Sequence, residues 1–221
     1  MGDKPLDLVL LGPVGAGKGT QARRIAERYH VPHVASGDLL RGHRARNTEL
    51  GLSAAQYMDR GALVPDDLVI SMVVHRMREP DANHGVLLDG FPRTVAQAKA
   101  LDKELEEEGR SLQRALYLQV PFETLVERAA GRWTCRNCGA TYNYRVNPPR
   151  KPGVCDVCGG ELYQREDDRA DVVTERIRVY LRDTVPVLDY YRNRGILREI
   201  DGTLDIESVA AEIERQLEAA V

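Results

Sequence analysis

The chain has 221 residues, a formal net charge of −3 and a hydrophobic content of 43%, which suits one large domain or one domain that carries insertions. The slight negative charge disfavours a nucleic-acid-binding surface, and no apolar run approaches the roughly 20 residues of a membrane span. Because residues 1–7 lack the apolar stretch of a signal peptide, we expect a cytoplasmic protein.

Short apolar runs alternate along the chain with segments of helical periodicity. Buried strands are expected at residues 6–11, 33–35, 86–89, 115–120 and 196–200. Helices are expected to begin near Lys18, Asp38, Asp66, Val95 and Pro121. In the final helix one apolar stripe is formed by Ile206, Val209, Ala210, Ile213 and Leu217, with Asp205 suited to cap it. Pro186 is expected to break or kink the helical pattern around residues 173–191. The alternation predicts an α/β fold with a parallel sheet covered on both faces.

A glycine-rich loop, residues 12–20 with the sequence GPVGAGKGT, follows the first predicted strand and opens the first predicted helix. Glycines let successive backbone N–H groups converge on anionic oxygens, and a helix N-terminus favours the same anion. Lys18 adds a positive charge suited to the β- and γ-phosphates. The strict pattern has Ser or Thr directly after the lysine, whereas here Gly19 precedes Thr20. The loop therefore predicts a phosphate site, and a second motif is needed to indicate the reaction.

The second motif lies at residues 86–94, VLLDGFPRT, where a predicted buried strand ends in Asp89 and the following turn carries Arg93. A carboxylate at the end of a parallel strand can hold Mg²⁺ directly or through water. A guanidinium can bind a phosphate with two hydrogen bonds. The two motifs together indicate chemistry on phosphate groups.

Two segments interrupt the alternation and are interpreted as insertions into one core. Residues 36–64, the helical insert, are expected to be helical without a strand. Residues 132–168, the cysteine insert, are rich in Cys, Gly, Pro and Tyr, which predicts small strands and turns. We also expect the acidic run 102–108 to be a solvent-facing helix side that ends at Gly109. Each of the five histidines is expected to be a surface or packing residue.

The cysteine insert contains all four cysteines of the chain, as Cys135-x2-Cys138 and Cys155-x2-Cys158, and a glycine follows each pair. This spacing is typical of a zinc ribbon with four cysteine ligands, and the glycines allow N–H groups to turn back onto the thiolates. Four thiolate ligands leave no open coordination position, so the metal is expected to be structural. The alternatives are a disulfide or redox pair, or a nucleic-acid- or protein-binding module suggested by the basic and aromatic residues of 132–151.

Three motifs carry a close resemblance to the adenylate kinases: residues 17–20 (GKGT), 36–41 (SGDLLR) and 89–93 (DGFPR). The resemblance covers nearly the whole chain, and the cysteine insert is similar to the metal-bearing lid of some bacterial members. It implies a P-loop NTPase-type five-stranded core formed by residues 1–35, 65–131 and 169–221. It further implies a helical AMP-binding domain at residues 36–64 and a zinc-binding lid at residues 132–168.

The same resemblance implies roles for individual residues. ATP is expected to be bound by Gly15, Ala16, Gly17, Lys18, Gly19, Thr20, Arg128 and Arg132. AMP is expected to be bound by Ser36, Gly37, Arg41, Val64, Gly90, Arg93, Gln97, Arg165 and Arg176, with Gln97 hydrogen-bonded to the adenine. The catalytic set is expected to be Lys18, Arg93, Arg128, Arg165 and Arg176. Thr20 and Asp89 are expected to organise Mg²⁺, Asp167 and Asp168 to help hold a closed state, and Cys135, Cys138, Cys155 and Cys158 to bind zinc.

The reaction implied is reversible phosphoryl transfer from MgATP to AMP, which gives two ADP by direct in-line transfer under a closing lid. Two alternatives stay open. One is another nucleoside monophosphate kinase, with UMP or CMP as acceptor or GTP as donor; the other is a zinc-ribbon nucleic-acid-binding module. The expected cofactors are Mg²⁺ with ATP and structural Zn²⁺, and the expected partners are ATP, AMP and ADP. We expect a monomer that binds neither nucleic acid nor membrane.

Overall fold

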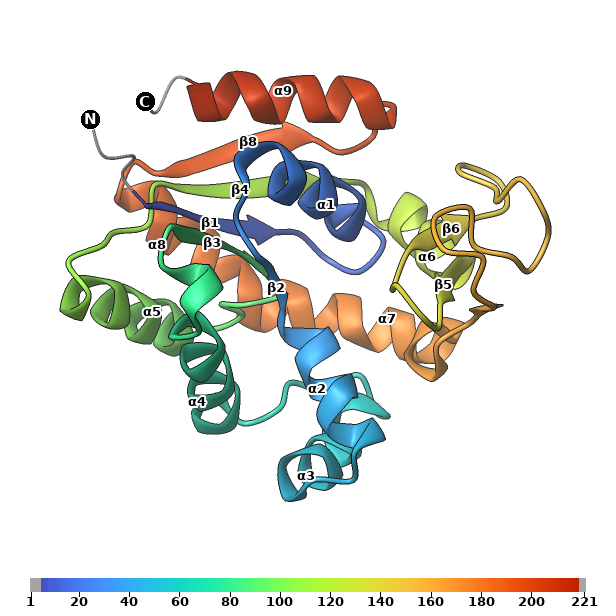
Figure 1. Cartoon of the computed structure of the whole chain (residues 1–221), viewed down its shortest axis with the longest axis horizontal. Helices are drawn as coiled ribbons and strands as arrows, with labels where there is room; N and C mark the ends of the chain where they lie inside the picture. The colour runs from blue at the N-terminus through green and yellow to red at the C-terminus, as the bar shows by residue number, and fades with distance from the viewer. Residues whose placement is uncertain (1–4, 219–221) are drawn as a thin grey trace.

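The computed structural model describes residues 5–218, and its centre is a sheet with the strand order β2–β3–β1–β4–β8 (Figure 1). These strands are β1 Leu6–Leu11, β2 His33–Ala35, β3 Gly85–Asp89, β4 Arg114–Gln119 and β8 Leu197–Asp201. Each pairing between neighbouring strands is parallel. The predicted five-stranded parallel sheet is confirmed within the described residues, and each predicted strand agrees with the observed one to within one residue at either end.

Helices occupy most of the chain between these strands. They are α1 Lys18–Tyr29, α2 Ser36–Ala45, α3 Glu49–Met58, α4 Asp66–Met77, α5 Val95–Glu107, α6 Phe122–Ala130, α7 Ala170–Val179, α8 Val185–Asn193 and α9 Ile206–Glu218. Shorter turns are η1 Pro80–Ala82, η2 Glu166–Asp168 and the π-helical turn η3 Tyr180–Thr184. The starts predicted at Lys18, Asp66 and Val95 are confirmed. As predicted, Asp205 caps α9: its Oδ1 accepts the backbone N–H groups of Glu207 and Ser208, each over 3.0 Å. None of the helices in residues 5–218 is long and apolar enough to cross a membrane.

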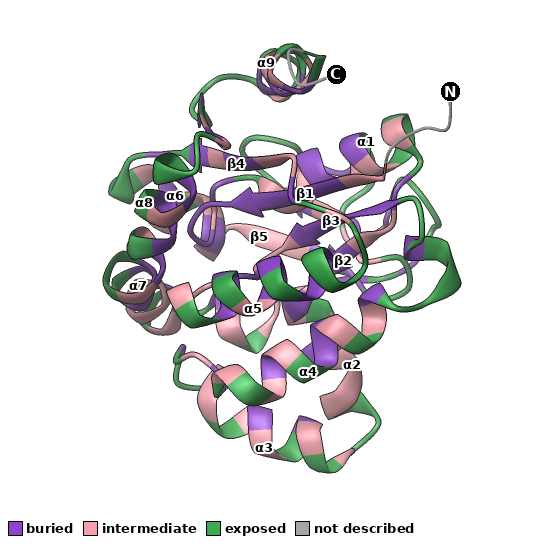
Figure 2. Ribbon diagram, turned by 90° about the vertical axis from the view of Figure 1, so that its left-hand side faces the viewer, coloured by how far each residue is buried: buried purple, intermediate pink, exposed green. Residues whose placement is uncertain are grey.

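The central strand β1 explains why helices cover both faces of the sheet. Successive side chains of a strand point to opposite faces. Leu8 and Leu10 pack in one buried cluster with residues of α1 and α9, whereas Val9 and Leu11 pack in a second cluster with residues of α4, α5 and α8. Figure 2 shows the central strands largely in the colour of buried residues, between these helices. The near-continuous apolar sequence of β1 is therefore what a strand buried on both faces requires.

The two inserts project from the carboxyl-terminal side of the sheet (Figure 1), and the helical insert joins one of the core clusters through Leu40 and Ala54. The helical insert consists of α2 and α3, which pack so closely that a Cβ on Gly51 would lie 2.3 Å from the backbone carbonyl carbon of His43. The cysteine insert forms a small antiparallel sheet with the order β6–β5–β7, from β5 Arg132–Cys135, β6 Thr141–Asn143 and β7 Leu162–Tyr163. The predicted secondary structure of both segments is confirmed.

Pro186 does not end the helical run around residues 173–191. The chain continues from α7 through η3 into α8, and Pro186 lies in the first turn of α8. Just before it, the N–H of Val185 donates to the carbonyl of Tyr180, five residues back. Proline has no N–H to donate and its ring conflicts with the carbonyl four residues earlier. The wider π-helical turn is where the helix departs from regular geometry at this position.

The prediction of a solvent-facing acidic side at residues 102–108 is wrong for Asp102 and Glu104, which are buried. The hydroxyl of Tyr190 donates to Asp102 over 2.5 Å, and Arg194 also pairs with this carboxylate. Arg78 donates to Glu104 over 2.7 Å. Burial raises the pKa of Asp102 although Tyr190 and Arg194 oppose this effect. These two acids therefore tie α5 to its neighbours instead of facing water.

Candidate active site

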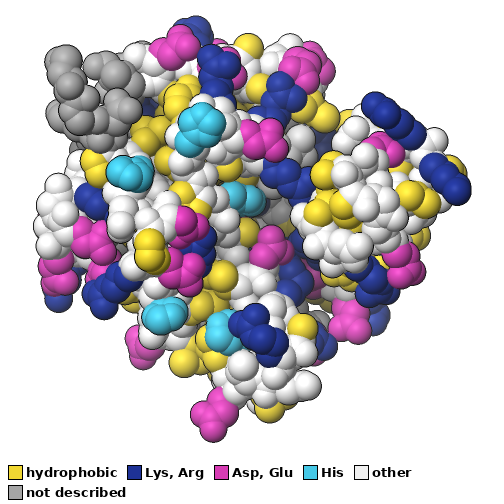
Figure 3. Space-filling view, viewed as in Figure 1, with side chains coloured by type: hydrophobic (Ala, Val, Ile, Leu, Met, Phe, Trp, Pro, Cys, Tyr) yellow, Lys and Arg dark blue, Asp and Glu magenta, His cyan; other side chains and the backbone are white. Residues whose placement is uncertain are grey.

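A cavity of about 410 Å³ lies at the carboxyl ends of the central strands, between the core and the two inserts. Its lining comes from the glycine-rich loop after β1, the turn after β3, the helical insert and the cysteine insert. Figure 3 shows basic and acidic side chains along the hollow between the core and the cysteine insert. In open α/β sheets ligands bind outside the carboxyl ends of the strands, so this is where a binding site is expected.

The loop between β1 and α1 has the backbone shape of a phosphate-binding loop. Gly15 and Gly17 have φ angles of 87° and 93°, in the left-handed region that favours glycine. A Cβ on Gly15 would lie 2.4 Å from the carbonyl oxygen of Leu125, whereas the space around Gly17 and Gly19 is open. The first helical residue is Lys18, whose Nζ donates to the carbonyl oxygens of Gly12 (2.7 Å) and Pro13 (3.1 Å). The loop thus presents the α1 N-terminus and a lysine to the cavity.

Lys18 and Asp89 place opposite charges beside this loop. Asp89 ends β3 and pairs in register with Leu10 of β1. Burial lowers the pKa of Lys18 to about 8, although the charge of Asp89 opposes this effect. Burial alone would raise the pKa of Asp89, but the hydrogen bond with His33 and the charge of Lys18 outweigh it, and the pKa lies below its usual value. Asp89 is therefore ionised at neutral pH and suited to a cation.

His33 is a cavity residue that the sequence analysis missed. Its Nε2 lies 3.3 Å from Oδ2 of Asp89, and its ring lines the cavity. The prediction that each histidine has only a surface or packing role is therefore wrong for His33. No sequence signal was present, because the contact depends on β2 pairing with β3, which brings Ala35 beside Asp89.

Arg93 and Arg41 approach the cavity from the turn after β3 and from the helical insert. Nε of Arg93 donates to the carbonyl oxygen of Gly90 over 2.8 Å, and the hydroxyl of Ser36 donates to the same oxygen over 2.7 Å. Arg41 pairs with Asp38, a cavity residue that the sequence analysis did not single out, over 2.6 Å. Burial lowers the pKa of Arg93; the charge of Asp89 opposes this effect and that of Arg41 adds to it. These cations repel each other across the cavity.

Asp167 and Asp168 connect the arginines of the cysteine insert and of α7. Arg176 lies 2.8 Å from the Asp167 carboxylate, and Nε of Arg132 donates to Asp168 over 2.8 Å. Arg165 reaches toward the helical insert, with Nη2 3.5 Å from Oδ1 of Asp38. Burial lowers the pKa of Arg176 to about 10, and the charge of Arg132 adds to this effect while that of Asp167 opposes it. At Arg176 burial therefore outweighs the attraction of Asp167, whereas at Arg132 the contacts with Asp168 outweigh burial and raise the pKa.

Most of the predicted site residues line this one cavity. They are Gly15, Ala16, Gly17, Lys18, Gly19, Thr20, Gly37, Arg41, Asp89, Gly90, Arg93, Arg128, Arg132, Cys138, Arg165, Asp167 and Arg176. Ser36, Val64 and Gln97 do not line it: Val64 belongs to the buried core, Ser36 holds the carbonyl of Gly90, and Gln97 is buried directly behind Arg93. Arg128 extends the site on the other side, where it donates to the carbonyl oxygen of Gly202 over 2.7 Å.

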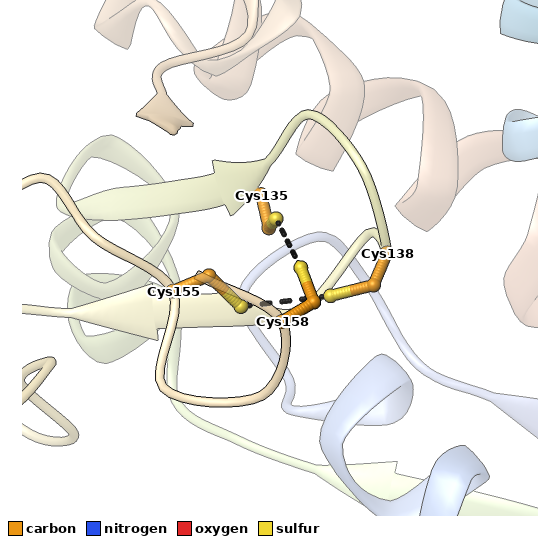
Figure 4. A group of neighbouring side chains, drawn as sticks. All are labelled: Cys135, Cys138, Cys155 and Cys158. Carbon is orange, nitrogen blue, oxygen red and sulfur yellow. Dashed lines mark hydrogen bonds between the residues drawn. The ribbon is translucent and has the colours of Figure 1, made fainter. Parts of the chain in front are cut away.

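The four cysteines form one cluster in the cysteine insert (Figure 4). Their sulfur atoms all lie within 4.8 Å of one another, and all four are free thiols. A tetrahedral site with Zn–S bonds of about 2.3 Å requires sulfurs about 3.8 Å apart, so the geometry fits zinc. Gly139 and Gly159 have φ angles of 69° and 71° and turn the chain after each pair. Backbone N–H groups of Asn137 and Cys138 donate to the Cys135 sulfur. These N–H groups lie before Gly139 in the chain, within the turn between the two cysteines.

Comparison with known proteins agrees with this site. A sequence model of the family described as adenylate kinase matches residues 10–196. A protein named adenylate kinase from Archaeoglobus fulgidus is 52% identical over 213 residues, 96% of this chain and 98% of its own. Similarly named proteins from Carboxydothermus hydrogenoformans (51% identical, 96% of this chain and 100% of its own) and Methanosarcina barkeri (46%, 96% and 98%) align over the same extent.

A parallel sheet with a phosphate loop at its carboxyl edge, facing a cluster of arginines, defines a P-loop phosphotransferase. The extent and degree of similarity narrow this class: the chain belongs to the adenylate kinase family. Its reaction is the transfer of a phosphoryl group from MgATP to AMP, with two ADP as products, and this assignment is favoured over the other nucleoside monophosphate kinases and over a nucleic-acid-binding zinc ribbon.

Proposed function

We propose that the residues lining the cavity carry out this transfer in one in-line step. The observation that carries the proposal is a set of half-buried, mutually repelling cations that line one cavity. Arg41 lowers the pKa of Arg93 and of Arg165, and Arg132 lowers that of Arg165 and of Arg176. In each case burial is the larger cause and acts in the same direction. Such a cluster is relieved by a polyanion. Phosphoryl transfer asks a protein mainly to position two anions and neutralise the charge that develops between them.

The donor and the acceptor occupy opposite ends of the proposed site. Residues 15–20 with Arg128 and Arg132 hold the ATP phosphates, and Arg41 and Arg93 hold the AMP phosphate, whose oxygen is the nucleophile. Arg165 and Arg176 bind between them, over the transferred group. No covalent enzyme intermediate is required. Gln97 makes its contact with the adenine from behind Arg93, which requires the base to reach a side chain that is buried without substrate.

Thr20 and Asp89 are proposed to organise Mg²⁺ and its waters. Both line the cavity, and the lowered pKa of Asp89 keeps it a carboxylate, the type of ligand that Mg²⁺ prefers. When bound with the triphosphate, the ion neutralises charge on the phosphate oxygens. Lys18, at the N-terminus of α1, places its ammonium group against the same oxygens.

We propose that the chain works as a core, at residues 1–35, 65–131 and 169–221, with an AMP-binding domain at 36–64 and a lid at 132–168. Ion pairs join the two inserts across the cavity: Arg44 lies 3.2 Å from Glu166, and Arg165 lies 3.5 Å from Asp38. Closure of these parts over the substrates excludes water and so suppresses hydrolysis of ATP. The acidic net charge of −3 supports a protein that does not bind nucleic acid. We propose a cytoplasmic monomer.

A panel of donors and acceptors tests the assignment directly. ATP or GTP is combined with AMP, CMP, UMP or GMP, and product formation is followed by a coupled assay. ATP with AMP is expected to give the highest kcat/KM. A higher value with UMP or CMP, or with GTP as donor, would reassign the chain to another monophosphate specificity.

Replacement of Arg93 by alanine is expected to lower kcat/KM for AMP roughly 100-fold and to reduce kcat as well. The reason is that the two hydrogen bonds of the guanidinium bind the AMP phosphate and also orient its oxygen, which is the nucleophile. Steady-state kinetics with AMP varied at saturating ATP measures both values. Arg215→Ala is the matched control, because Arg215 pairs with Glu212 on α9, away from the cavity. An unchanged kcat/KM in the Arg93 variant would remove Arg93 from the acceptor site.

We propose that the four cysteines hold one structural Zn²⁺. Cys155→Ser is expected to abolish tight metal binding and to lower the melting temperature of the protein, while much of the activity survives at low temperature because Lys18 and the arginines remain. Free zinc-finger peptides gain about 10–16 kcal/mol from metal, but this insert is tethered at both ends to a folded core, so the loss should be smaller. Metal content and thermal unfolding, with the chelated wild type alongside, measure the effect.

Val157→Ser is the control for the cysteine replacement, because Val157 lies in the same turn and is 72% exposed. It should keep the metal and the melting temperature. The fluorescence of Trp133, the single tryptophan of the chain and part of β5, reports on order in the cysteine insert. A metal-free protein that keeps this insert folded but loses all activity would overturn the structural role.

A further inference from the structure

Asp66, in the first turn of α4, holds the side chain of Gln97. Nε2 of Gln97 donates to Oδ1 of Asp66 over 2.7 Å, and the hydroxyl of Thr94 donates to Oδ2 over 2.8 Å. On its other side, Oε1 of Gln97 accepts the backbone N–H of Arg93 over 2.7 Å. Each polar atom of the Gln97 amide therefore has its own partner, and the partners come from two different segments of the chain.

These two partners determine which way round the amide stands. A carboxylate accepts hydrogen bonds and a backbone N–H donates them, so the NH2 group must face Asp66 and the oxygen must face Arg93. The reversed amide would set oxygen against carboxylate and NH2 against N–H. Gln97 is only 1% exposed, and a buried polar group left unpaired is costly. In the reversed orientation the buried amide would lose both hydrogen bonds, and at this burial water has no access to replace them.

The Gln97 amide keeps one free N–H and one free lone pair in this fixed orientation. Adenine presents an acceptor at N1 and a donor at its 6-amino group, which an amide in one orientation can satisfy together. A 6-oxo purine presents a donor at N1 and an acceptor at position 6, which requires the amide to be reversed. An orientation lock on Gln97 therefore discriminates between the two classes of base.

We infer that Asp66 is a specificity-determining positioning residue, which makes the acceptor site favour a 6-amino purine over a 6-oxo purine by fixing the orientation of the Gln97 amide. The inference rests on the proposed role of Gln97 as the reader of the acceptor base. Asp66 begins α4, two residues after the end of the helical insert, so the lock lies at the junction between that insert and the turn that carries Arg93.

The test compares AMP with inosine monophosphate (IMP), its 6-oxo counterpart, as acceptors with ATP as donor. Asp66→Ala is expected to lower the ratio of kcat/KM for AMP to that for IMP roughly tenfold, the effect of about one hydrogen bond. The change should lie in the acceptor KM, with KM for ATP unchanged. Asp66→Asn, which keeps the shape but can offer an NH2 group to Gln97, should lower the ratio too. Asp67→Ala removes the same charge from the next, exposed residue and should leave the ratio as in the wild type.

A double-mutant cycle separates the two levels of the proposal. Gln97→Ala should lower the ratio by itself, and adding Asp66→Ala to it should have no further effect on the ratio. If Gln97→Ala leaves the ratio unchanged, the proposed reading of the base by Gln97 is wrong. If Gln97→Ala lowers the ratio but neither Asp66 variant does, the orientation lock is wrong. Equal losses for AMP and IMP in both Asp66 variants would also overturn it, since they indicate only a structural role.

Discussion

Replacement of Lys18 by methionine is expected to lower kcat by roughly 10²–10³-fold or more, with the fold intact. Lys18 lies half-buried at the start of α1, and its Nζ reaches the carbonyl oxygens of Gly12 and Pro13 at the base of the phosphate loop. A preorganised positive charge at this place stabilises the charge that grows on the phosphate oxygens in the transition state. Methionine fills similar space without that charge.

Circular dichroism and steady-state kinetics measure the two halves of this prediction. Lys99→Met is the control, because Lys99 is exposed on α5 and does not line the cavity. It should be as active as the wild type. A folded Lys18 variant with near-normal turnover would refute the role given to the glycine-rich loop.

Replacement of Arg110 by alanine is expected to destabilise the protein by about 3–5 kcal/mol. Nε of Arg110 donates to Oδ2 of Asp7 over 3.0 Å, and a second guanidinium nitrogen contacts Oδ1. The two side chains are 7% and 1% exposed. The large effect arises because the variant leaves the Asp7 carboxylate buried in β1 without its counter-ion, with only a backbone hydrogen bond from Val86, which costs far more than the intact pair contributes.

Urea unfolding measures this loss, with Arg24→Ala as the matched control. Arg24 pairs with Glu207 at the surface, where the side chains are 42% and 76% exposed. A pair of this kind contributes about 0–1 kcal/mol. Equal losses in the two variants would contradict the argument from burial.

The pH dependence of the Arg110 variant gives an independent check. Burial raises the pKa of Asp7 above its usual value of 3.8, and Arg110 opposes this effect. Without Arg110 the native pKa should rise further, so the native state binds a proton more readily than the unfolded chain does. A raised native pKa adds stability in acid that is lost as the pH rises through it. The deficit relative to the wild type should therefore be smaller near about pH 5 than near about pH 7.

Several features of this protein were determined by the sequence alone, because their signals are local. The apolar run of β1 is buried on both faces wherever it lies in a parallel sheet, and the glycines of residues 12–19 permit the loop that follows it. The two Cys-x2-Cys pairs predicted a cluster, since the spacing within each pair brings its sulfurs together and the small sheet has only to join the pairs. The fold class and most residues of the cavity followed from such patterns.

Only the tertiary structure decided which polar residues are buried and which of them meet. Asp102 looks like part of a solvated acidic run, yet its partners Tyr190 and Arg194 lie about 90 residues further along the chain. His33 reaches Asp89 because the strand order places β2 beside β3. Asp66 reaches Gln97 for a similar reason, across the junction of α4 and α5. The physical cause is the same in each case. A carboxylate with little access to water needs a hydrogen-bonding partner, and only the arrangement of strands and helices brings that partner close. The periodicity of the sequence does not indicate which residue the partner will be.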